Sequence, residues 1–261
     1  MKYVLTIAGS DSCGGAGIQA DLKTITSLGA HALTAITAVT AQNSGGIDSI
    51  HLITDGMISR QVDMVVKDIF PDSVKTGMLP TSDAIEEVAD LIKRHSLNNI
   101  VVDPVFRASS GRQLMDDSAL KILKNILLPF VNVITPNLDE AEILTGMRVR
   151  NKKDMEKAAR EIKGYGPDVV VTGGHLEERC IDLLYDGKEL FSFEGRKIKT
   201  DNSHGSGCVF SSSLATFLAM GYDIAKATGE AHEFTRKAIR QGYSWGGKYG
   251  VVNPANNRFH S

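Results

Sequence analysis

The feature that most constrains the fold of this chain is an alternation of short apolar runs with segments of helical periodicity. Short runs that are rich in β-branched side chains and apolar on both faces occur at residues 3–8, 100–103, 131–135 and 168–172. Strands of this kind are typical of a parallel sheet with both faces covered. Between them, apolar side chains recur on one helical face at residues 83–95, 117–128 and 154–163.

The chain departs from this alternation after residue 180. Two apolar runs flank the turn residues Asp186, Gly187 and Lys188, which predicts a hairpin over residues 180–185 and 189–193. Two further helices are predicted at about residues 207–220 and 224–241. No internal repeat, low-complexity linker or long charge run interrupts the sequence. We therefore expect one domain over residues 1–261, with three α/β/α layers around a central, mostly parallel sheet.

Composition narrows the class of protein. Lys+Arg number 29 and Asp+Glu number 31, so the net charge of −2 lacks the basic excess of a nucleic-acid-binding protein. No apolar run approaches the roughly 20 residues of a membrane span, and the first residues lack the apolar core of a signal peptide. The three cysteines, an odd number, argue for reduced thiols. We expect a cytoplasmic protein that binds a small molecule and neither nucleic acid nor membrane.

Small or acidic residues follow several of the predicted strands, where parallel sheets collect their ligands. A long glycine-rich segment at residues 9–21 follows the first strand, and it lacks the Gly-Lys-Ser/Thr of a P-loop. Asp103 follows the second, where a carboxylate can hold a metal, orient a phosphate or simply cap a loop. Asn137 and Glu140 follow the third, in a pattern that suits either magnesium–phosphate binding or ordinary helix capping.

The most informative segment lies at residues 202–211. Gly205, Ser206 and Gly207 would present consecutive backbone N–H groups at a helix N-terminus, an arrangement suited to a transferring phosphoryl group. The same position lowers the pKa of a thiol, so we expect Cys208 to be partly thiolate and able to act as a base. In isolation, a buried cysteine beside a glycine-rich cap would explain the segment equally well. The convergence of the other strand ends favours the catalytic interpretation.

Seven motifs occur in this order between residues 4 and 241: VLTIAGSDSCGGAGIQADLKT, TAVTAQN, VKTGML, VVDPV, TPNLDEAE, GGH and HGSGC. Together they resemble the hydroxymethylpyrimidine and phosphomethylpyrimidine kinases of thiamin synthesis, which have the ribokinase-like fold. The resemblance implies transfer of a phosphoryl group from ATP, with Mg²⁺, to 4-amino-5-hydroxymethyl-2-methylpyrimidine. A second transfer to the monophosphate would give the diphosphate. The resemblance also implies a homodimer.

The same resemblance implies a role for each site residue. Cys208 would be the base, at the position where other ribokinase relatives place an aspartate after the anion hole. The aminopyrimidine would be contacted by Gln42 and Asp21, with Gly9, Met78 and Val105 nearby. The nucleotide side would be formed by Asp103, Asn137, Glu140, Thr172 and Gly173, with Asp103 and Glu140 as the acidic pair at magnesium.

Two departures from the family pattern concern positive charge. Thr172 stands where the family usually has a lysine that approaches the ATP phosphates, and Ser109 stands where a loop lysine is common. The loss of such a cation weakens the stabilisation of transition-state charge. The candidates to replace these lysines are Arg107, Arg112 and Lys75.

Two alternative functions are compatible with the sequence. A vitamin B6 kinase would phosphorylate a related hydroxymethylated ring, but the amide of Gln42 can both donate to and accept from an aminopyrimidine edge. A non-catalytic pyrimidine-binding relative would explain the missing lysines, but the intact segment around Cys208 argues against it. The histidines and cysteines show no metal-ligand spacing, so no structural zinc is expected. Cys180 is expected in the core.

Overall fold

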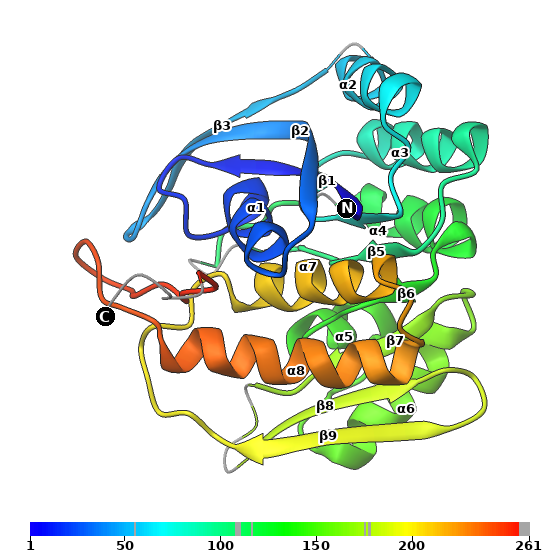
Figure 1. Ribbon diagram of the computed structural model, residues 1–261. Helices are drawn as coiled ribbons and strands as arrows, with labels where there is room; N and C mark the ends of the chain where they lie inside the picture. The colour runs from blue at the N-terminus through cyan, green and yellow to red at the C-terminus, as the bar shows by residue number, and fades with distance from the viewer. Residues whose placement is uncertain (55, 108–110, 116, 175, 177–178, 256–261) are drawn as a thin grey trace.

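The computed structural model describes residues 1–54, 56–107, 111–115, 117–174, 176 and 179–255. Within these residues a nine-stranded sheet has the order β3-β2-β1-β4-β5-β6-β7-β8-β9 (Figure 1). Its strands are β1 (Tyr3–Asp11), β2 (His31–Asn43), β3 (Gly46–Leu52), β4 (Ser73–Thr76), β5 (Ile100–Val102), β6 (Val133–Ile134), β7 (Asp168–Thr172), β8 (Arg179–Tyr185) and β9 (Leu190–Arg196). Pairing is parallel from β2 through β7, whereas β3, β8 and β9 pair antiparallel.

Helices cover both faces of the sheet, which confirms the predicted three-layer α/β/α class (Figure 1). One face carries α1 (Gly17–Ser27), α7 (Ser206–Ala219) and α8 (Ile224–Arg240). The other carries α2 (Met57–Asp68), α3 (Ser82–His95), α4 (Asp117–Ile122), α5 (Leu138–Thr145) and α6 (Lys152–Lys163). Among the described residues, none of the helices combines the length and apolarity needed to traverse a bilayer.

The burial of both sheet faces explains why the central strands appear in the sequence as continuous apolar runs. Along β1, Leu5 and Ile7 join the core beneath α2 to α6, while Val4 joins the core beneath α7 and α8. All three side chains are fully buried. Complete burial of such a side chain contributes about 1.5–3 kcal/mol, so a strand with two covered faces keeps few polar positions.

The predicted strands and helices are present, but one helix ends early, and helix α2 and three strands were not predicted. The helix expected at residues 117–128 ends at Ile122, and a π-helical turn (Leu123–Leu127) and a 3₁₀ turn (Leu128–Phe130) follow it. Strands β2, β3 and β4 were not predicted. Strand β2 is rich in Ala and Thr, and β4 includes Lys75, so neither carries the strong apolar signal of the other strands.

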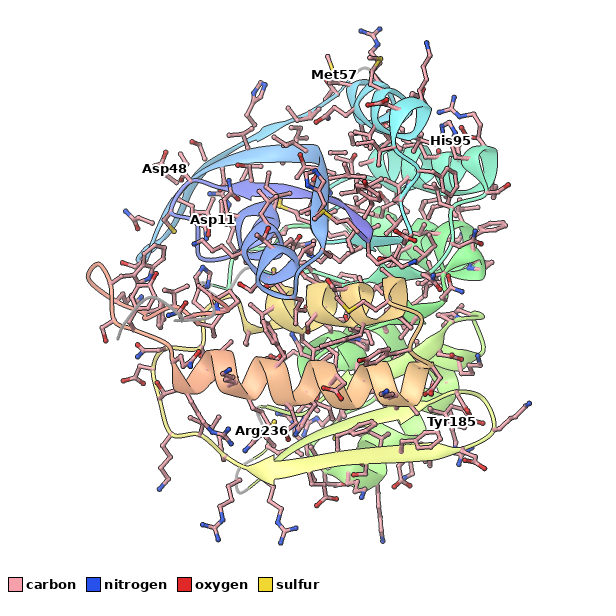
Figure 2. All side chains as sticks on the ribbon, viewed as in Figure 1. Asp11, Asp48, Met57, His95, Tyr185 and Arg236 are labelled. Carbon is pink, nitrogen blue, oxygen red and sulfur yellow. The ribbon has the colours of Figure 1, made fainter. Side chains whose placement is uncertain are left out.

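The connections place a topological switch point between β1 and β4. The chain leaves β1 for β2 on one side and later returns to β4 on the other, so the two carboxyl-end loops diverge there. Ligands of open α/β sheets bind in such a crevice. Figure 2 shows Asp11 beside α1 and Arg236 between α8 and the β8–β9 hairpin, well apart along this edge of the sheet.

Candidate active site

A cavity of about 1130 Å³ lies at the carboxyl ends of the parallel strands. All predicted site residues except Asp21 and Gly173 line it, namely Gly9, Gln42, Met78, Asp103, Val105, Asn137, Glu140, Thr172, Gly205, Ser206, Gly207 and Cys208. We call the part at Gly9, Gln42, Met78 and Val105 the β1 end, and the part at Thr172, Cys180, Lys197 and Arg236 the β8 end. Ser109 lies outside the described residues.

Asp11 organises the glycine-rich loop at the β1 end. Its carboxylate accepts hydrogen bonds from the backbone N–H groups of Cys13 at 2.9 Å, Gly15 at 3.0 Å and Ala16 at 2.8 Å. Burial raises the pKa of Asp11, but hydrogen bonds from His204, Cys13 and the backbone outweigh it and lower that pKa to about 2. Because His204 precedes α7, Asp11 connects the loop after β1 with the loop that carries Cys208.

These two glycine-rich loops pack backbone against backbone. Gly205 has a φ of +85°, and a Cβ atom there would overlap the carbonyl oxygen of Gly15. Gly17 has a φ of +57°, and a Cβ atom there would overlap the carbonyl oxygen of Gly9. Only glycine combines a positive φ with such a close approach. Gly205 is therefore required by the packing of the two loops, and Gly17 by packing within the first loop.

Gln42 is held at the end of β2 by the glycine-rich loop. Its backbone N–H donates to the Ser12 hydroxyl at 2.9 Å, and its carbonyl accepts from the same hydroxyl at 2.8 Å. Gln42 lines the cavity with Met78, whose sulfur would lie 3.1 Å from a Cβ atom at Gly9. The β1 end is therefore a mostly apolar slot with one amide able to donate and accept.

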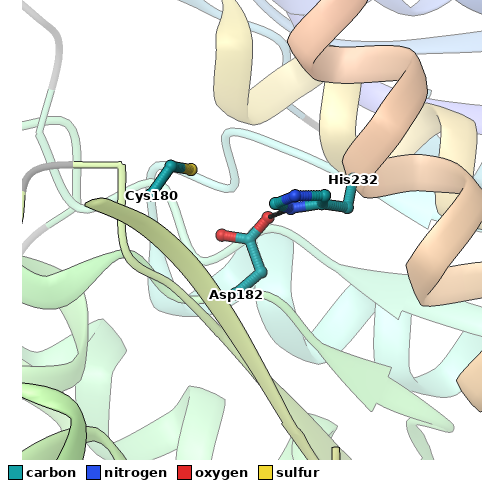
Figure 3. A group of neighbouring side chains, drawn as sticks. All are labelled: Cys180, Asp182 and His232. Atoms are coloured by element: carbon teal, nitrogen blue, oxygen red, sulfur yellow. Dashed lines mark hydrogen bonds and ion pairs between the residues drawn. The ribbon is translucent and has the colours of Figure 1, made fainter. Parts of the chain in front are cut away.

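At the β8 end, the structure brings His232 of α8 to Cys180 and Asp182, which lie two positions apart on β8. Asp182 on β8 and His232 on α8 are joined at 2.7 Å between Oδ2 and Nδ1, and the donor atoms of Cys180, Asp182 and His232 lie within 4.8 Å of one another (Figure 3). The other Asp182 oxygen accepts from the Gly173 N–H at 3.1 Å. Cys180, expected in the core, instead lines the cavity, and burial raises its pKa to about 11.

The cations of the cavity agree only in part with those predicted. Lys75 lines the cavity but is fully buried and paired with Asp21. Arg112 does not line it and donates to the carbonyl oxygens of Ile47 and Asp48 at 2.8 Å each. Arg107 does line the cavity. Sequence reasoning missed three further lining cations, which come from separate parts of the chain and belong to no recognisable motif: Arg148, Lys197 and Arg236.

Two buried carboxylates face the centre of the cavity. Asp103 accepts from the Ser211 hydroxyl at 2.9 Å, and Glu140 forms a capping box with Asn137 at the start of α5. Burial raises the pKa of Asp103, against the opposing effect of Lys75. Burial and then the charge of Asp103 raise the pKa of Glu140 well above its usual value. A divalent cation bound by carboxylate oxygens would relieve this repulsion.

The N-terminus of α7 reaches the same place. The Ser206 N–H donates to the Ser203 carbonyl at 3.2 Å, so one of the three predicted anion-hole amides is used within the loop. The first-turn amides of Gly207 and Cys208 have no intrahelical partners by helix geometry. Burial, assisted by Asp103 and Asp21 and opposed by Lys75, raises the pKa of Cys208 to about 12. The expectation of a partly thiolate Cys208 is therefore wrong.

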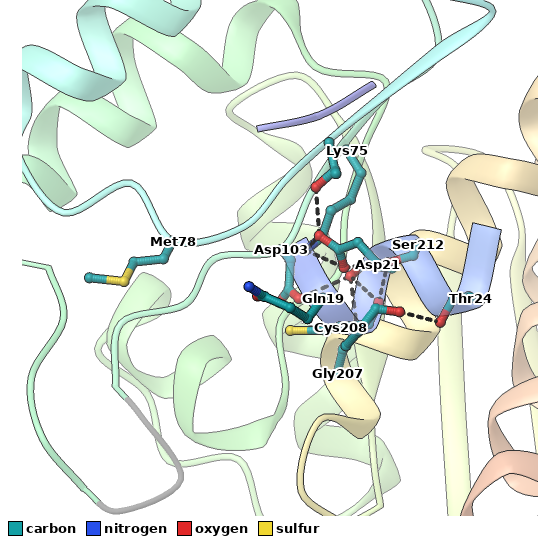
Figure 4. A network of polar contacts seen from close by, with 12 residues as sticks. Gln19, Asp21, Thr24, Lys75, Met78, Asp103, Gly207, Cys208 and Ser212 are labelled. Atoms are coloured by element: carbon teal, nitrogen blue, oxygen red, sulfur yellow. Dashed lines mark hydrogen bonds and ion pairs between the residues drawn. The ribbon is translucent and has the colours of Figure 1, made fainter. Parts of the chain in front are cut away.

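Asp21 lies beneath the cavity and does not line it. Lys75 Nζ lies 3.0 and 2.9 Å from its two carboxylate oxygens, and both side chains are fully buried. The hydroxyls of Thr6 and Ser212 also donate to Asp21, and the Ser212 hydroxyl contacts the Cys208 carbonyl (Figure 4). The structure thus gives Asp21 a supporting position under α7, in contrast to the predicted substrate contact.

Comparisons of the sequence and the fold with known proteins indicate the family of this chain. The family model described as phosphomethylpyrimidine kinase matches residues 11–253. A hydroxymethylpyrimidine/phosphomethylpyrimidine kinase of Bacillus subtilis is 43% identical over 95% of this chain and 93% of its own length. The ADP complex of Bacillus subtilis pyridoxal kinase has a TM-score of 0.92 and 38% identity, and it covers 100% of both chains. Clostridium difficile phosphomethylpyrimidine kinase has a TM-score of 0.81 and 37% identity, covering 92% of this chain and 100% of its own. The chain belongs to the phosphomethylpyrimidine kinase family, with the ribokinase-like fold.

Proposed function

We propose that the chain transfers the γ-phosphoryl group of ATP to the hydroxymethyl oxygen of 4-amino-5-hydroxymethyl-2-methylpyrimidine, and then a second phosphoryl group to the monophosphate. The observation that carries this proposal is the convergence of Cys208, the α7 N-terminus and an acidic pair in one cavity. Phosphoryl transfer requires in-line positioning and neutralisation of charge more than covalent chemistry by the protein. The product of both steps is the diphosphate used in thiamin synthesis.

The β1 end is the proposed pyrimidine site. The apolar side chains of Met78 and Val105 suit the faces of a flat ring, and the Gln42 amide suits its amino and ring-nitrogen edge. Gly9 keeps the floor of the slot open because it has no side chain. In this position the hydroxymethyl group would be directed toward Cys208 and the α7 N-terminus.

Cys208 is the proposed general base. Its thiolate would accept the hydroxyl proton while the oxygen forms its bond to phosphorus and the bond to the ADP leaving group breaks. The thiol pKa of about 12 makes the thiolate a minor species near neutral pH. Turnover is therefore expected to rise with pH, which is a direct signature of this role. The amides of Gly207 and Cys208, with Gly205 as the N-cap, would stabilise charge on the transferred group.

The β8 end and the cavity centre are the proposed nucleotide side. Asp103 and Glu140 fit Mg²⁺, because both are buried oxygen ligands with raised pKa values that a cation would lower. When bound there, the ion would neutralise phosphate charge. Asn137 and Thr172 line the adjoining wall, and Gly173 supports it through Asp182. The solved pyridoxal kinase with ADP supports an adenine nucleotide as the phosphoryl donor.

The test is an ATP-dependent phosphorylation assay with three acceptors: the aminopyrimidine alcohol, its monophosphate and pyridoxal. We expect monophosphate and then diphosphate from the pyrimidine, separated by anion-exchange chromatography, and a much lower kcat/KM for pyridoxal. Preferred turnover of pyridoxal would assign the vitamin B6 reaction. Saturable pyrimidine binding without release of ADP would favour the non-catalytic alternative.

A Gln42→Leu variant sharpens this assay because Leu keeps a similar size and removes the amide. We expect its KM for the pyrimidine to rise by about 10-fold, the effect of one lost hydrogen bond in a buried site, while its KM for ATP stays unchanged. A single kinase domain over residues 1–261 is a further part of the proposal, supported by the family model that matches residues 11–253. A homodimer and a cytoplasmic location are also proposed.

A further inference from the structure

Arg236 is a buried cation at the β8 end of the cavity that the reaction described above does not use. Its residue is 5% exposed and lines the cavity from α8. The guanidinium lies against the backbone of Gly195 on β9, where any side chain would overlap it, and its Nη2 donates to the Arg196 carbonyl at 2.9 Å. Among the described residues, Nη1 has no hydrogen-bond partner.

The charge of Arg236 is also uncompensated in the part of the chain that the structure describes, because no carboxylate there forms an ion pair with it. Asp182, the nearby acid of the same cluster, is already bonded to His232 and to the Gly173 N–H. The adjoining Cys180 thiol has a pKa raised to about 11, so it is neutral at physiological pH. An unpaired buried charge is costly, and here an anion entering the cavity would compensate it.

The position of Arg236 relates it to Thr172, where the family lysine is missing. Thr172 pairs with Asp182 in the sheet register, Asp182 holds His232, and His232 precedes Arg236 by one turn of α8. Both Thr172 and Arg236 line the same end of the cavity. The positive charge beside Cys180 also opposes a metal ion at the Cys180, Asp182 and His232 cluster, so an anion is the ligand that this corner favours.

We propose that Arg236 binds the phosphate chain of the nucleotide and supplies from α8 the positive charge that the family lysine would supply at position 172. This inference rests on the proposed function, since it takes the β8 end as the nucleotide side. A guanidinium suits the role because its fixed N–H donors match phosphate oxygens. The unused Nη1 group is the donor left for that contact.

The test is the variant Arg236→Met, which keeps most of the side-chain volume and removes the charge. We expect its KM for ATP to rise about 10- to 100-fold, the range for one lost hydrogen bond to a charged group, with a smaller change in kcat. Its affinity for ADP in calorimetry should fall by a similar factor, while its affinity for adenosine should stay within twofold. The exposed neighbour Lys237 does not line the cavity, so Lys237→Met is the matched control and should behave as the unmodified protein.

The double variant Arg236→Met/Thr172→Lys should recover at least a tenfold lower KM for ATP, because it restores a cation from the other wall. A KM for ATP within twofold of the unmodified protein in Arg236→Met would overturn the inference, as would equal losses of ADP and adenosine affinity. If Arg236→Met fails to fold, Arg236→Lys replaces it. Its KM for ATP should rise, because an ammonium lacks the fixed pair of donors of a guanidinium, and an unchanged KM for ATP would overturn the inference. An unmodified protein without ATP-dependent phosphorylation would refute the proposed function itself, which distinguishes the two failures.

Discussion

Replacing Lys75 by Met should destabilise the protein severely, because it leaves Asp21 as an unpaired carboxylate in the core. Both side chains are fully buried, and Lys75 Nζ contacts both Asp21 oxygens at 2.9 and 3.0 Å. The remaining donors to Asp21 are the neutral hydroxyls of Thr6 and Ser212. Removing one partner of a buried ion pair costs about 3–5 kcal/mol, which corresponds to a decrease in Tm of ~6–20 °C for a chain of this size.

The assay is urea unfolding at pH 7, followed by circular dichroism, on Lys75→Met and on Lys75→Met/Asp21→Asn. The double variant should recover most of the lost free energy of unfolding, since it removes the charges of both members of the buried pair. The exposed pair Lys2–Asp72, at 2.7 Å, offers a matched control. Lys2→Met should cost about 0–1 kcal/mol. A loss below 1 kcal/mol in Lys75→Met, or no recovery in the double variant, would refute the argument.

The same variants separate the two roles given to Asp21. If the residue only supports α7 through Ser212, Asp21→Asn should lower stability and leave the KM for the pyrimidine within about twofold. If it contacts substrate, as the family resemblance implies, that KM should rise by an order of magnitude or more at unchanged stability. Steady-state kinetics and urea unfolding on one preparation decide between these outcomes.

Three further predictions concern the reacting centre and its loops. Cys208→Ala should lower kcat about 10²–10⁴-fold. If Cys208 is the base, the kcat of the unmodified enzyme should rise up to about tenfold per pH unit between pH 7 and 9, and the kcat of the variant should not. Gly205→Ala should abolish turnover and lower Tm, measured together, because a Cβ atom overlaps the Gly15 carbonyl; normal activity would contradict the close packing of the loops. Asp11 has a pKa of about 2 in the folded protein, against 3.8 for an unperturbed aspartate. The ionised carboxylate therefore contributes about 2 kcal/mol to the free energy of unfolding above pH 4, and this contribution is lost as the pH falls toward 2. Urea unfolding of Asp11→Asn between pH 6 and pH 2.5 should therefore show a weaker acid dependence than the unmodified protein, and equal acid dependence would contradict this assignment.

Strands β1, β5, β6 and β7 and most helices could be predicted from the sequence because most of their side chains pack in the core. Strands with two covered faces and helices with one apolar face leave periodic signals, and residues 100–103 and 168–172 are examples. Strand β4 gave no such signal because Lys75 occupies its middle, and a buried lysine is recognisable only when its partner Asp21 is placed beside it. The π-helical turn at Leu123–Leu127 likewise has no periodicity that distinguishes it from an α-helix.

The candidate site divides in the same way. Residues in contiguous motifs, such as Asp103 and the segment around Cys208, could be placed in advance because each motif follows a strand or begins a helix. The protonation state of Cys208 could not be predicted. The sequence indicates a helix N-terminus, which lowers the pKa of a thiol, but it does not show the burial that raises this pKa by more. Cys180 and Arg236 are single residues on β8 and α8, and only the folding of the hairpin against that helix brings them to the cavity.

The position of the β8–β9 hairpin at the edge of the sheet affects how the proposed nucleotide side would respond to nucleotide binding. Strand β9 is the outermost strand, and the hairpin carries Cys180, Asp182 and the backbone that supports Arg236. Edge elements open locally at a lower free energy than central strands. A nucleotide held there would bind the closed hairpin and not the open one, so donor binding and the local folding of this edge are linked equilibria. The pyrimidine slot lies toward the opposite edge of the sheet, because Gln42 is on β2, which pairs with the edge strand β3.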